Sequence, residues 1–296
     1  MSIKKMGFIF MCLFLCVILA SCKESPEELT IGLIPVRDAV EMKQDFEPIQ
    51  MYLEEKLGVS VKVIITENYA GLIEGMSNEK LDIAWYGAFS YIAAESELEL
   101  TPLVVQQRKD AGIYYNSQII TLKSSEIASI EDLEGKKFAF VDSGSTSGFV
   151  LPYALLVSRD IDYKTFFDES YYSGTHEQVP LDILQHKVDA GAISSTQFDK
   201  LISDGKIKSN DFSTIWESSA IPGSLYVARN DLDSETKEDF VQAMLTVHEE
   251  IPEGIKRFDN TLEKYIKVDS KEYNEIRNTA TILGKEYMYE NFLKGE

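Results

Sequence analysis

The chain has 296 residues, more than one hydrophobic core usually holds, and this length fits two lobes of about 100 to 150 residues each. Its formal net charge of −20 argues against nucleic acid as a partner, and it means that any anion site has to work through local hydrogen-bond donors. The three cysteines, Cys12, Cys16 and Cys22, all lie near the N-terminus, so the rest of the chain has none for a disulfide or a metal site.

The N-terminus has the organisation of a bacterial lipoprotein signal peptide. Two lysines precede an apolar run from Gly7 to Ala20, which is too short to cross a bilayer as a stable helix. The run ends in Leu-Ala-Ser-Cys, a sequence suited to cleavage before Cys22 and lipidation of its thiol. We predict a signal peptide over 1–21, a lipid anchor at Cys22 and a polar tether over 22–28. The alternative is a plain secretory signal cleaved elsewhere; in both cases the protein leaves the cytosol.

The folded part begins near Leu29 with apolar runs of strand length that alternate with helical periodicity. Strands are predicted at 29–36, 61–66 and 81–85, with a helix before residue 57 and another from Ala70. The alternation restarts with a strand at 137–141, a helix at 149–157, a helix after His176 and a strand at 188–193. This order predicts two α/β lobes, each with a mostly parallel sheet covered by helices.

Two further stretches, 113–122 and 225–228, are predicted to be the hinge strands that connect the lobes. Charged helical patterns dominate from Ser234 onward and are expected to pack on the first lobe. The first lobe then consists of 29–115 and 225–296, and the second of 116–224. Strand ends and helix N-termini of both lobes would face a common cleft.

The segment 138–148 carries the most specific chemistry, because a strand runs through a hydroxyl-rich turn into an apolar helix. Ser145, Thr146 and Ser147 stand at the helix start, where free backbone N–H groups and the helix dipole favour an anion. The alternative is an ordinary Ser/Thr helix cap. The segment lacks the Gly-Lys-Ser/Thr ending of a nucleotide phosphate loop, which argues against nucleotide hydrolysis.

Other polar and aromatic residues are candidates for the same cleft. His176 precedes a second helical stretch and is either an oxyanion donor or a structural hydrogen-bonding group. Tyr69 precedes a helix in the first lobe, and Tyr115 lies on the predicted crossover. Residues 82–87 end a strand that is suited to the cleft floor, although Trp85 is better explained as a core residue.

Five segments together resemble one known family. In chain order they are 30–35 (TIGLIP), 69–76 (YAGLIEGM), 82–87 (DIAWYG), 145–149 (STSGF) and 176–177 (HE). They are similar to the binding proteins of ABC transporters for phosphonate, phosphite and phosphate, and the resemblance covers nearly the whole chain after the tether. It implies a two-lobed periplasmic-binding-protein fold of type II, and an extracytoplasmic, membrane-anchored solute-binding protein that serves an ABC permease.

The resemblance also implies roles for individual residues. Ser145, Thr146, Ser147 and His176 would hold the phosphorus oxygens, with Tyr69 and Tyr115 closing from the other side. Relatives that take 2-aminoethylphosphonate use two carboxylates for its ammonium group, and the corresponding positions here are Thr196 and Ser224. Because a buried ammonium needs charged or strong acceptors, we expect a ligand with a small or absent carbon substituent. Rotation of Glu177 into the pocket would weaken this expectation.

Two other classes of function are compatible with parts of the sequence. A hydrolase would use Ser145, His176 and Asp142, but no Gly-x-Ser-x-Gly elbow is present. An extracytoplasmic sensor input would bind the same ligand and dock on a receptor instead of a permease. The three histidines have no metal-ligand spacing, so we expect no metal and no cofactor. We expect a monomer.

Overall fold

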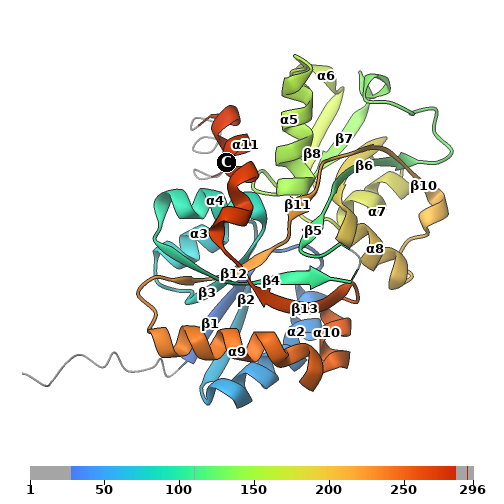
Figure 1. The fold of residues 1–296 in the computed structure, drawn as a ribbon. Coiled ribbons are helices and arrows are strands. Elements are labelled where there is room, and N and C mark those ends of the chain that lie inside the picture. Colours follow the sequence, from blue (N-terminus) through green and yellow to red (C-terminus); the bar gives the residue numbers. More distant parts are fainter. Residues whose placement is uncertain (1–27, 110, 285–291, 293–296) are drawn as a thin grey trace, which may run out of the picture.

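The computed structural model describes residues 28–109, 111–284 and 292, which form two α/β lobes placed one above the other in Figure 1. The predicted signal peptide and Cys22 lie outside the described residues. Of the predicted tether only Glu28 is described, and it is the first residue of strand β1. Within the described ranges, no helix combines the length and the apolar character needed to cross a bilayer.

The first lobe is built on a six-stranded sheet with the order β13-β4-β12-β3-β1-β2. Its strands are β1 (Glu28–Leu33), β2 (Ser60–Ile65), β3 (Ile83–Tyr86), β4 (Leu100–Arg108), β12 (Leu225–Arg229) and β13 (Leu262–Lys267). β2, β1 and β3 run parallel, whereas β12, β4 and β13 pair antiparallel with their neighbours. The parallel strands are those for which the sequence predicts βαβ units.

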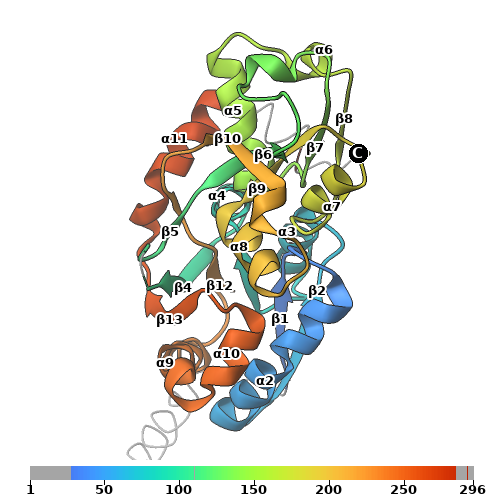
Figure 2. The same ribbon diagram turned by 90° about the vertical axis from the view of Figure 1, so that its right-hand side faces the viewer.

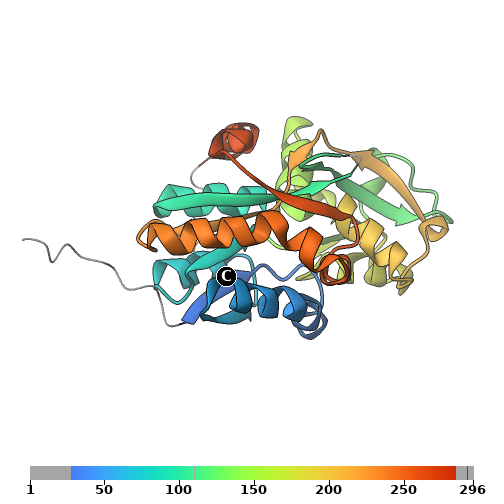
Figure 3. The ribbon, with the colours of Figure 1, turned by 60° about the horizontal axis from the view of Figure 1, so that its bottom comes forward.

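Helices cover both faces of this sheet. They are α2 (Ala39–Leu57), α3 (Ala70–Ser77), α4 (Ala88–Glu97), α9 (Ser234–Glu250), α10 (Pro252–Phe258) and α11 (Asn274–Leu283), with the 3-10 turn η4 (Ser270–Tyr273) before the last. α2, α9 and α10 pack on one another, and Figure 3 shows α2 and α9 running side by side. Phe240, Met244 and Val247 form the apolar face of α9 and are buried.

Helix α2 illustrates how local sequence sets these elements. The side chain of Asp38 accepts hydrogen bonds from the first N–H groups of the helix, and Gly58 ends it in the left-handed conformation with φ 67°. Met42, Phe46, Ile49 and other residues at intervals of three or four are buried, so one apolar stripe faces the sheet.

The second lobe is built on a five-stranded sheet with the order β10-β6-β9-β7-β8. Its strands are β6 (Ser117–Leu122), β7 (Lys137–Phe140), β8 (Glu169–Tyr172), β9 (Ala190–Ser194) and β10 (Phe212–Glu217). Its helices are the π-helical turn η2 (Thr146–Val150), which continues into α5 (Leu151–Ser158), then α6 (Tyr163–Phe166), α7 (Gln178–Leu184) and α8 (Ser195–Ser203). Two 3-10 turns, η1 (Glu131–Leu133) and η3 (Ser209–Asp211), complete it.

The two lobes are connected by a short antiparallel ribbon of β5 (Tyr114–Tyr115) and β11 (Ile221–Pro222). Figures 1 and 2 show this ribbon between the two sheets. The predicted crossover 113–122 therefore divides into β5 of the ribbon and β6 of the second sheet. The predicted hinge strand 225–228 is wrong as a hinge, because it forms β12 inside the first sheet. The predicted lobe boundaries, at 115/116 and 224/225, fall beside the ribbon and stay predictions.

The α/β, two-lobed fold class is confirmed, but each sheet is mixed and not mostly parallel. A strand that enters a lobe at the cleft edge runs against the strands that end at that edge. β12 enters the first lobe in this way and β6 enters the second, and both pair antiparallel with their neighbours. The sequence pattern does not predict β13, because the charged residues of this strand resemble a helical pattern. β13 lies at the edge of the sheet, where charged residues prevent association with other strands.

Candidate functional site

A cavity of about 30 Å³ lies between the lobes. Its lining includes all the residues for which the sequence predicts a binding role: Tyr69, Tyr115, Ser145, Thr146, Ser147, His176, Thr196 and Ser224. No carboxylate from the described residues lines it. A cavity of this size has room for a small polar group but not for a long substituent.

The turn after β7 positions the three hydroxyl residues. Asp142 accepts a hydrogen bond from the backbone N–H of Gly144 at 2.7 Å, and Ser145 Oγ accepts one from Gly148 N–H at 3.0 Å, which caps the helix. Gly148 is required here, because a Cβ would lie 2.4 Å from the Cβ of Val141. The helix then continues through η2 into α5, so that its free N-terminal N–H groups lie at the cavity.

Thr146 and Ser147 are buried; Thr146 connects the second lobe to the first, and Ser147 bonds to β6 within the second lobe. Thr146 Oγ1 accepts a hydrogen bond of 2.8 Å from the backbone N–H of Phe89 in the first lobe. The carbonyl of Ser147 accepts one of 2.6 Å from Ser117 Oγ. Burial raises the pKa of Tyr115, and contacts with Ser147 and Thr146 oppose that rise, so the Tyr115 hydroxyl faces these two residues.

His176 is held in one tautomer. Its Nδ1 accepts a hydrogen bond of 3.1 Å from the backbone N–H of Ser194, so the proton of the neutral ring is on Nε2. Nε2 lies 3.4 Å from Ser145 Oγ at the cavity. Burial lowers the pKa of His176 to about 3, which keeps the ring neutral at physiological pH. The residue therefore presents one N–H donor to the cavity.

This arrangement is unsuited to hydrolysis, although Ser145 and His176 are neighbours. A histidine with its proton on Nε2 cannot accept the proton of the Ser145 hydroxyl. Asp142, the third residue of the candidate triad, accepts from the backbone N–H groups of Gly144 and Tyr69 and not from the His176 ring. The geometry leaves the Nε2–H of His176 as a donor beside Ser145 at the cavity.

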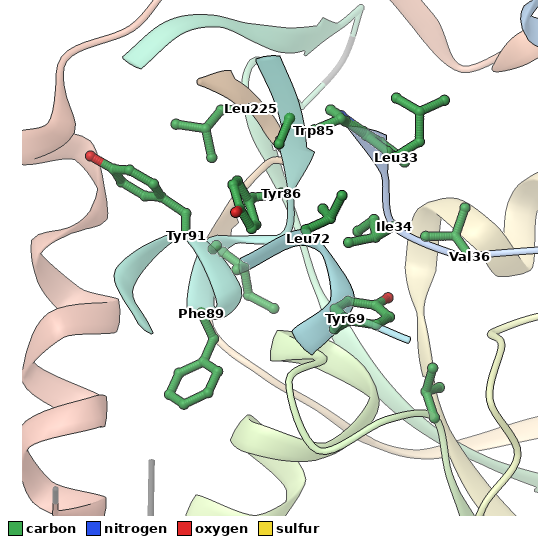
Figure 4. Packing of buried hydrophobic residues seen from close by; sticks show 14 of the residues in the cluster. Leu33, Ile34, Val36, Tyr69, Leu72, Trp85, Tyr86, Phe89, Tyr91 and Leu225 are labelled. Atoms are coloured by element: carbon green, nitrogen blue, oxygen red, sulfur yellow. The ribbon is translucent and has the colours of Figure 1, made fainter. Parts of the chain in front are cut away.

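Tyr69 closes the cavity from the first lobe. Figure 4 shows its ring beside Ile34 and Leu72, with the hydroxyl at the end of the side chain. Burial raises the pKa of the phenol far above its ordinary range, the Asp142 carboxylate adds to this, and contact with Ser145 opposes it. The phenol therefore stays protonated and serves as a donor.

Trp85 is both a core residue and part of the cavity wall. Its ring packs edge-on against Phe258, with centroids 5.8 Å apart, and lies 6.5 Å from the ring of Tyr226. Its indole also lines the cavity, as the position of 82–87 at the end of a strand suggests.

Three polar residues of the lining have no signal in the sequence: Gln106, Arg108 and Gln197. Gln106 and Arg108 lie on β4, a strand that the sequence does not reveal. Arg108 pairs with Asp259 at 3.1 Å, and its Nε donates to Thr261. These partners come from a distant part of the chain, so no local pattern predicts the arrangement.

Glu177, a possible acceptor for an ammonium group, is engaged outside the cavity. Its carboxylate accepts from the backbone N–H of Asp38 at 3.2 Å and pairs with Lys206, which also pairs with Glu41. Asp38 and Glu41 belong to the first lobe, so these contacts connect the lobes. Together with the Phe89–Thr146 hydrogen bond they join the two lobes beside the cavity.

Comparison with known proteins finds binding proteins of phosphonate and phosphate transporters. Residues 31–273 match the family described as ABC transporter, phosphonate, periplasmic substrate-binding protein. The phosphate-import protein PhnD of Mycolicibacterium smegmatis is 31% identical over 71% of this chain and 68% of its own. The phosphonates-binding periplasmic protein of Escherichia coli is 30% identical over 74% of this chain and 66% of its own.

Solved structures show the same fold. A binding protein component of an ABC phosphonate transporter from Pseudomonas aeruginosa has a TM-score of 0.79 at 24% identity, with 92% of this chain and 94% of that chain covered. PhnD1 of Prochlorococcus marinus in complex with methylphosphonate has a TM-score of 0.76 at 23% identity, with 88% and 99% covered. The chain belongs to the family of periplasmic substrate-binding proteins of phosphonate ABC transporters.

Proposed function

We propose that this protein is a lipid-anchored solute-binding protein that captures a small phosphorus oxyanion, a phosphonate, phosphite or phosphate, and delivers it to an ABC permease. The observation that carries the proposal is the donor set at the cavity. The neutral Nε2–H of His176, the hydroxyls at 145–147 and the phenols of Tyr69 and Tyr115 line one small space.

These groups suit a tetrahedral anion for a physical reason. Hydrogen bonds from neutral donors to a charged acceptor contribute about 1.5–3 kcal/mol each, and they need no lysine at the site. The N-terminus of the helix formed by η2 and α5 adds a favourable dipole. Local donors of this kind hold an anion even in a chain with a net charge of −20.

The names of the relatives support this class of ligand. One relative is a phosphate-import protein, another binds phosphonates, and a structure with the same fold contains methylphosphonate. Among the described residues no carboxylate lines the cavity for an ammonium group, and Glu177 is engaged by Lys206 and Asp38. We therefore expect 2-aminoethylphosphonate to bind weakly. The protonated Nε2 of His176 supports binding over catalysis.

The mechanism we propose is closure on the ligand. The anion first contacts the second lobe at 145–147 and His176, and the tyrosines then reach it as the β5–β11 ribbon bends. The contacts of Glu177 and Thr146 with the first lobe form in this closed state. The permease would recognise the closed form.

The test is calorimetric titration of the protein from Lys23 onward with phosphate, phosphite, methylphosphonate and 2-aminoethylphosphonate at one pH. We expect binding of at least one small oxyanion and weak binding of 2-aminoethylphosphonate. In solution scattering, the radius of gyration should be smaller with bound ligand than without it. Ser147→Ala should weaken binding by about 10- to 100-fold, since one hydrogen bond to the anion is lost. Ser158→Ala, at an exposed serine of the same lobe, is the control. No binding of any member would refute the proposal.

A further inference from the structure

Four polar side chains of the cavity have a buried atom without a hydrogen-bond partner. These atoms are Trp85 Nε1, Gln106 Nε2, Arg108 Nη1 and Gln197 Oε1. The residues are only 3%, 2%, 8% and 8% exposed. An unpaired buried polar atom is unfavourable, so four at one cavity indicate a missing ligand group.

The surrounding contacts fix the orientation of two of these groups. Arg108 uses Nη2 for Asp259 and Gln106 and uses Nε for Thr261, which leaves Nη1 as its free donor. Gln106 uses Oε1 to accept from Arg108 Nη2 at 3.3 Å, and its Nε2, which lies near the Tyr265 hydroxyl, makes no hydrogen bond. Both residues are therefore held in place before a ligand arrives.

These groups lie on other elements than 145–147 and His176, the predicted oxyanion donors of the second lobe. Trp85, Gln106 and Arg108 come from β3 and β4 of the first lobe, and Gln197 comes from α8. Arg108 Nη1 is 3.7 Å from the position that a Cβ on Gly223 would occupy, next to Ser224. Because Arg108 Nη1 lies beside Gly223 and Gln197 follows Thr196 on α8, we place these groups at the end of the cavity near Ser224 and Thr196. A fourth group on phosphorus would lie there if 145–147 and His176 hold the other three.

We propose that this end of the cavity recognises an oxygen as the fourth group on phosphorus, so that the protein selects inorganic phosphate over phosphite and methylphosphonate. The proposal rests on the proposed function and specifies its ligand. The N–H groups of Trp85, Gln106 and Arg108 donate to the fourth oxygen. When that oxygen carries the proton of monohydrogen phosphate, its O–H group donates a hydrogen bond to Gln197 Oε1, and the oxygen accepts from at most two of these N–H groups.

Phosphite has a hydrogen at this position and methylphosphonate has a methyl group. Neither satisfies the free donors or Gln197 Oε1, which would stay buried and unpaired in the complex. The Arg108 guanidinium also disfavours an ammonium substituent through like-charge repulsion.

The experiment compares phosphate, phosphite and methylphosphonate by calorimetry with the wild type and with Gln106→Leu and Gln197→Leu. We expect wild-type phosphate affinity to be at least about tenfold higher than that of the other two. Each substitution should weaken phosphate binding by about tenfold or more and leave methylphosphonate binding within about threefold. Gln118→Leu is the matched control, because Gln118 Oε1 is also buried and unpaired but does not line the cavity.

Arg108→Lys provides a second comparison, with Arg229→Lys as control. Arg229 pairs with Asp82 at 3.1 Å, the same separation as in the Arg108–Asp259 pair, and does not line the cavity. Only Arg108→Lys should reduce the preference for phosphate. Equal or tighter binding of phosphite or methylphosphonate to the wild type would overturn the inference and leave the proposed function intact. No binding of any of the three would overturn both.

Discussion

The backbone N–H of Phe89 donates a 2.8 Å hydrogen bond to Oγ1 of Thr146, and this bond joins the two lobes at the cavity. Phe89 lies in the first turn of α4, whose N-cap residue Gly87 provides no side-chain cap. The second lobe therefore caps a helix of the first. Thr146 also lines the cavity, so one residue of the proposed ligand site takes part in the contact between the lobes.

Thr146→Val should weaken ligand binding without unfolding the protein. Valine keeps the shape of threonine but lacks the acceptor for Phe89 N–H, and loss of a helix cap costs about 0.5–2 kcal/mol, or roughly 2- to 30-fold in affinity. Thr146→Ser should restore most of the affinity. Calorimetry and solution scattering measure both effects. Thr165→Val, at an exposed threonine of the second lobe, is the control. Unchanged affinity of Thr146→Val would show that this bond does not contribute to closure.

His176 should make stability depend on pH. Its pKa is lowered to about 3 in the folded protein, whereas the unfolded chain has the ordinary value of about 6.5. Between these values the unfolded state binds a proton that the folded state does not. The contribution of His176 to the free energy of unfolding is therefore fully present above about pH 6.5. It falls as the pH drops toward 3, with a slope of up to about 1.4 kcal/mol per pH unit.

Urea unfolding of the wild type and of His176→Gln at pH 7.5, 6 and 5 tests this prediction. The stability advantage of the wild type should shrink as the pH falls, because glutamine does not titrate. His186→Asn, at an exposed histidine with φ of 56°, should keep the wild-type pH dependence. If the free energy of unfolding changed equally with pH in wild type and His176→Gln, the lowered pKa of His176 would be contradicted.

Lys206→Met should open the clamshell slightly. Lys206 pairs with Glu41 of the first lobe and Glu177 of the second, and because it is partly exposed we expect only about a two- to fivefold loss of ligand affinity. The difference from wild type should diminish at high salt. Lys137→Met is the control, since Lys137 pairs with Glu169 within the second lobe. A loss that does not respond to salt would point to packing of the lysine stem and not to its charge.

Gly87→Ala and Gly148→Ala should separate binding from stability. A Cβ at Gly87 would meet Ser90, Thr146 and Tyr69 at 3.5–3.7 Å, so the protein should fold, but the methyl group would reduce the cavity and lower affinity. A Cβ at Gly148 would lie 2.4 Å from Val141, and we expect a loss of about 1–3 kcal/mol in stability. Thermal unfolding and calorimetry together distinguish the two results; a stable Gly148→Ala variant with normal affinity would contradict the packing argument.

The sequence by itself determined the parts of the protein that depend on neighbouring residues. The βαβ alternation and the hydroxyl turn at 145–147 follow from periodicity and helix capping, which act over a few positions. The resemblance added the site residues, and all of them line the same cavity.

Only the tertiary structure decided what depends on residues far apart in the chain. Arg108 is oriented by Asp259, 151 positions away, and the tautomer of His176 is set by the N–H of Ser194. The antiparallel strands and the β5–β11 ribbon follow from where the chain enters each lobe. Hydrogen-bond partners, burial and the protonation state that results from them exist only when the chain is folded, so no local pattern contains them.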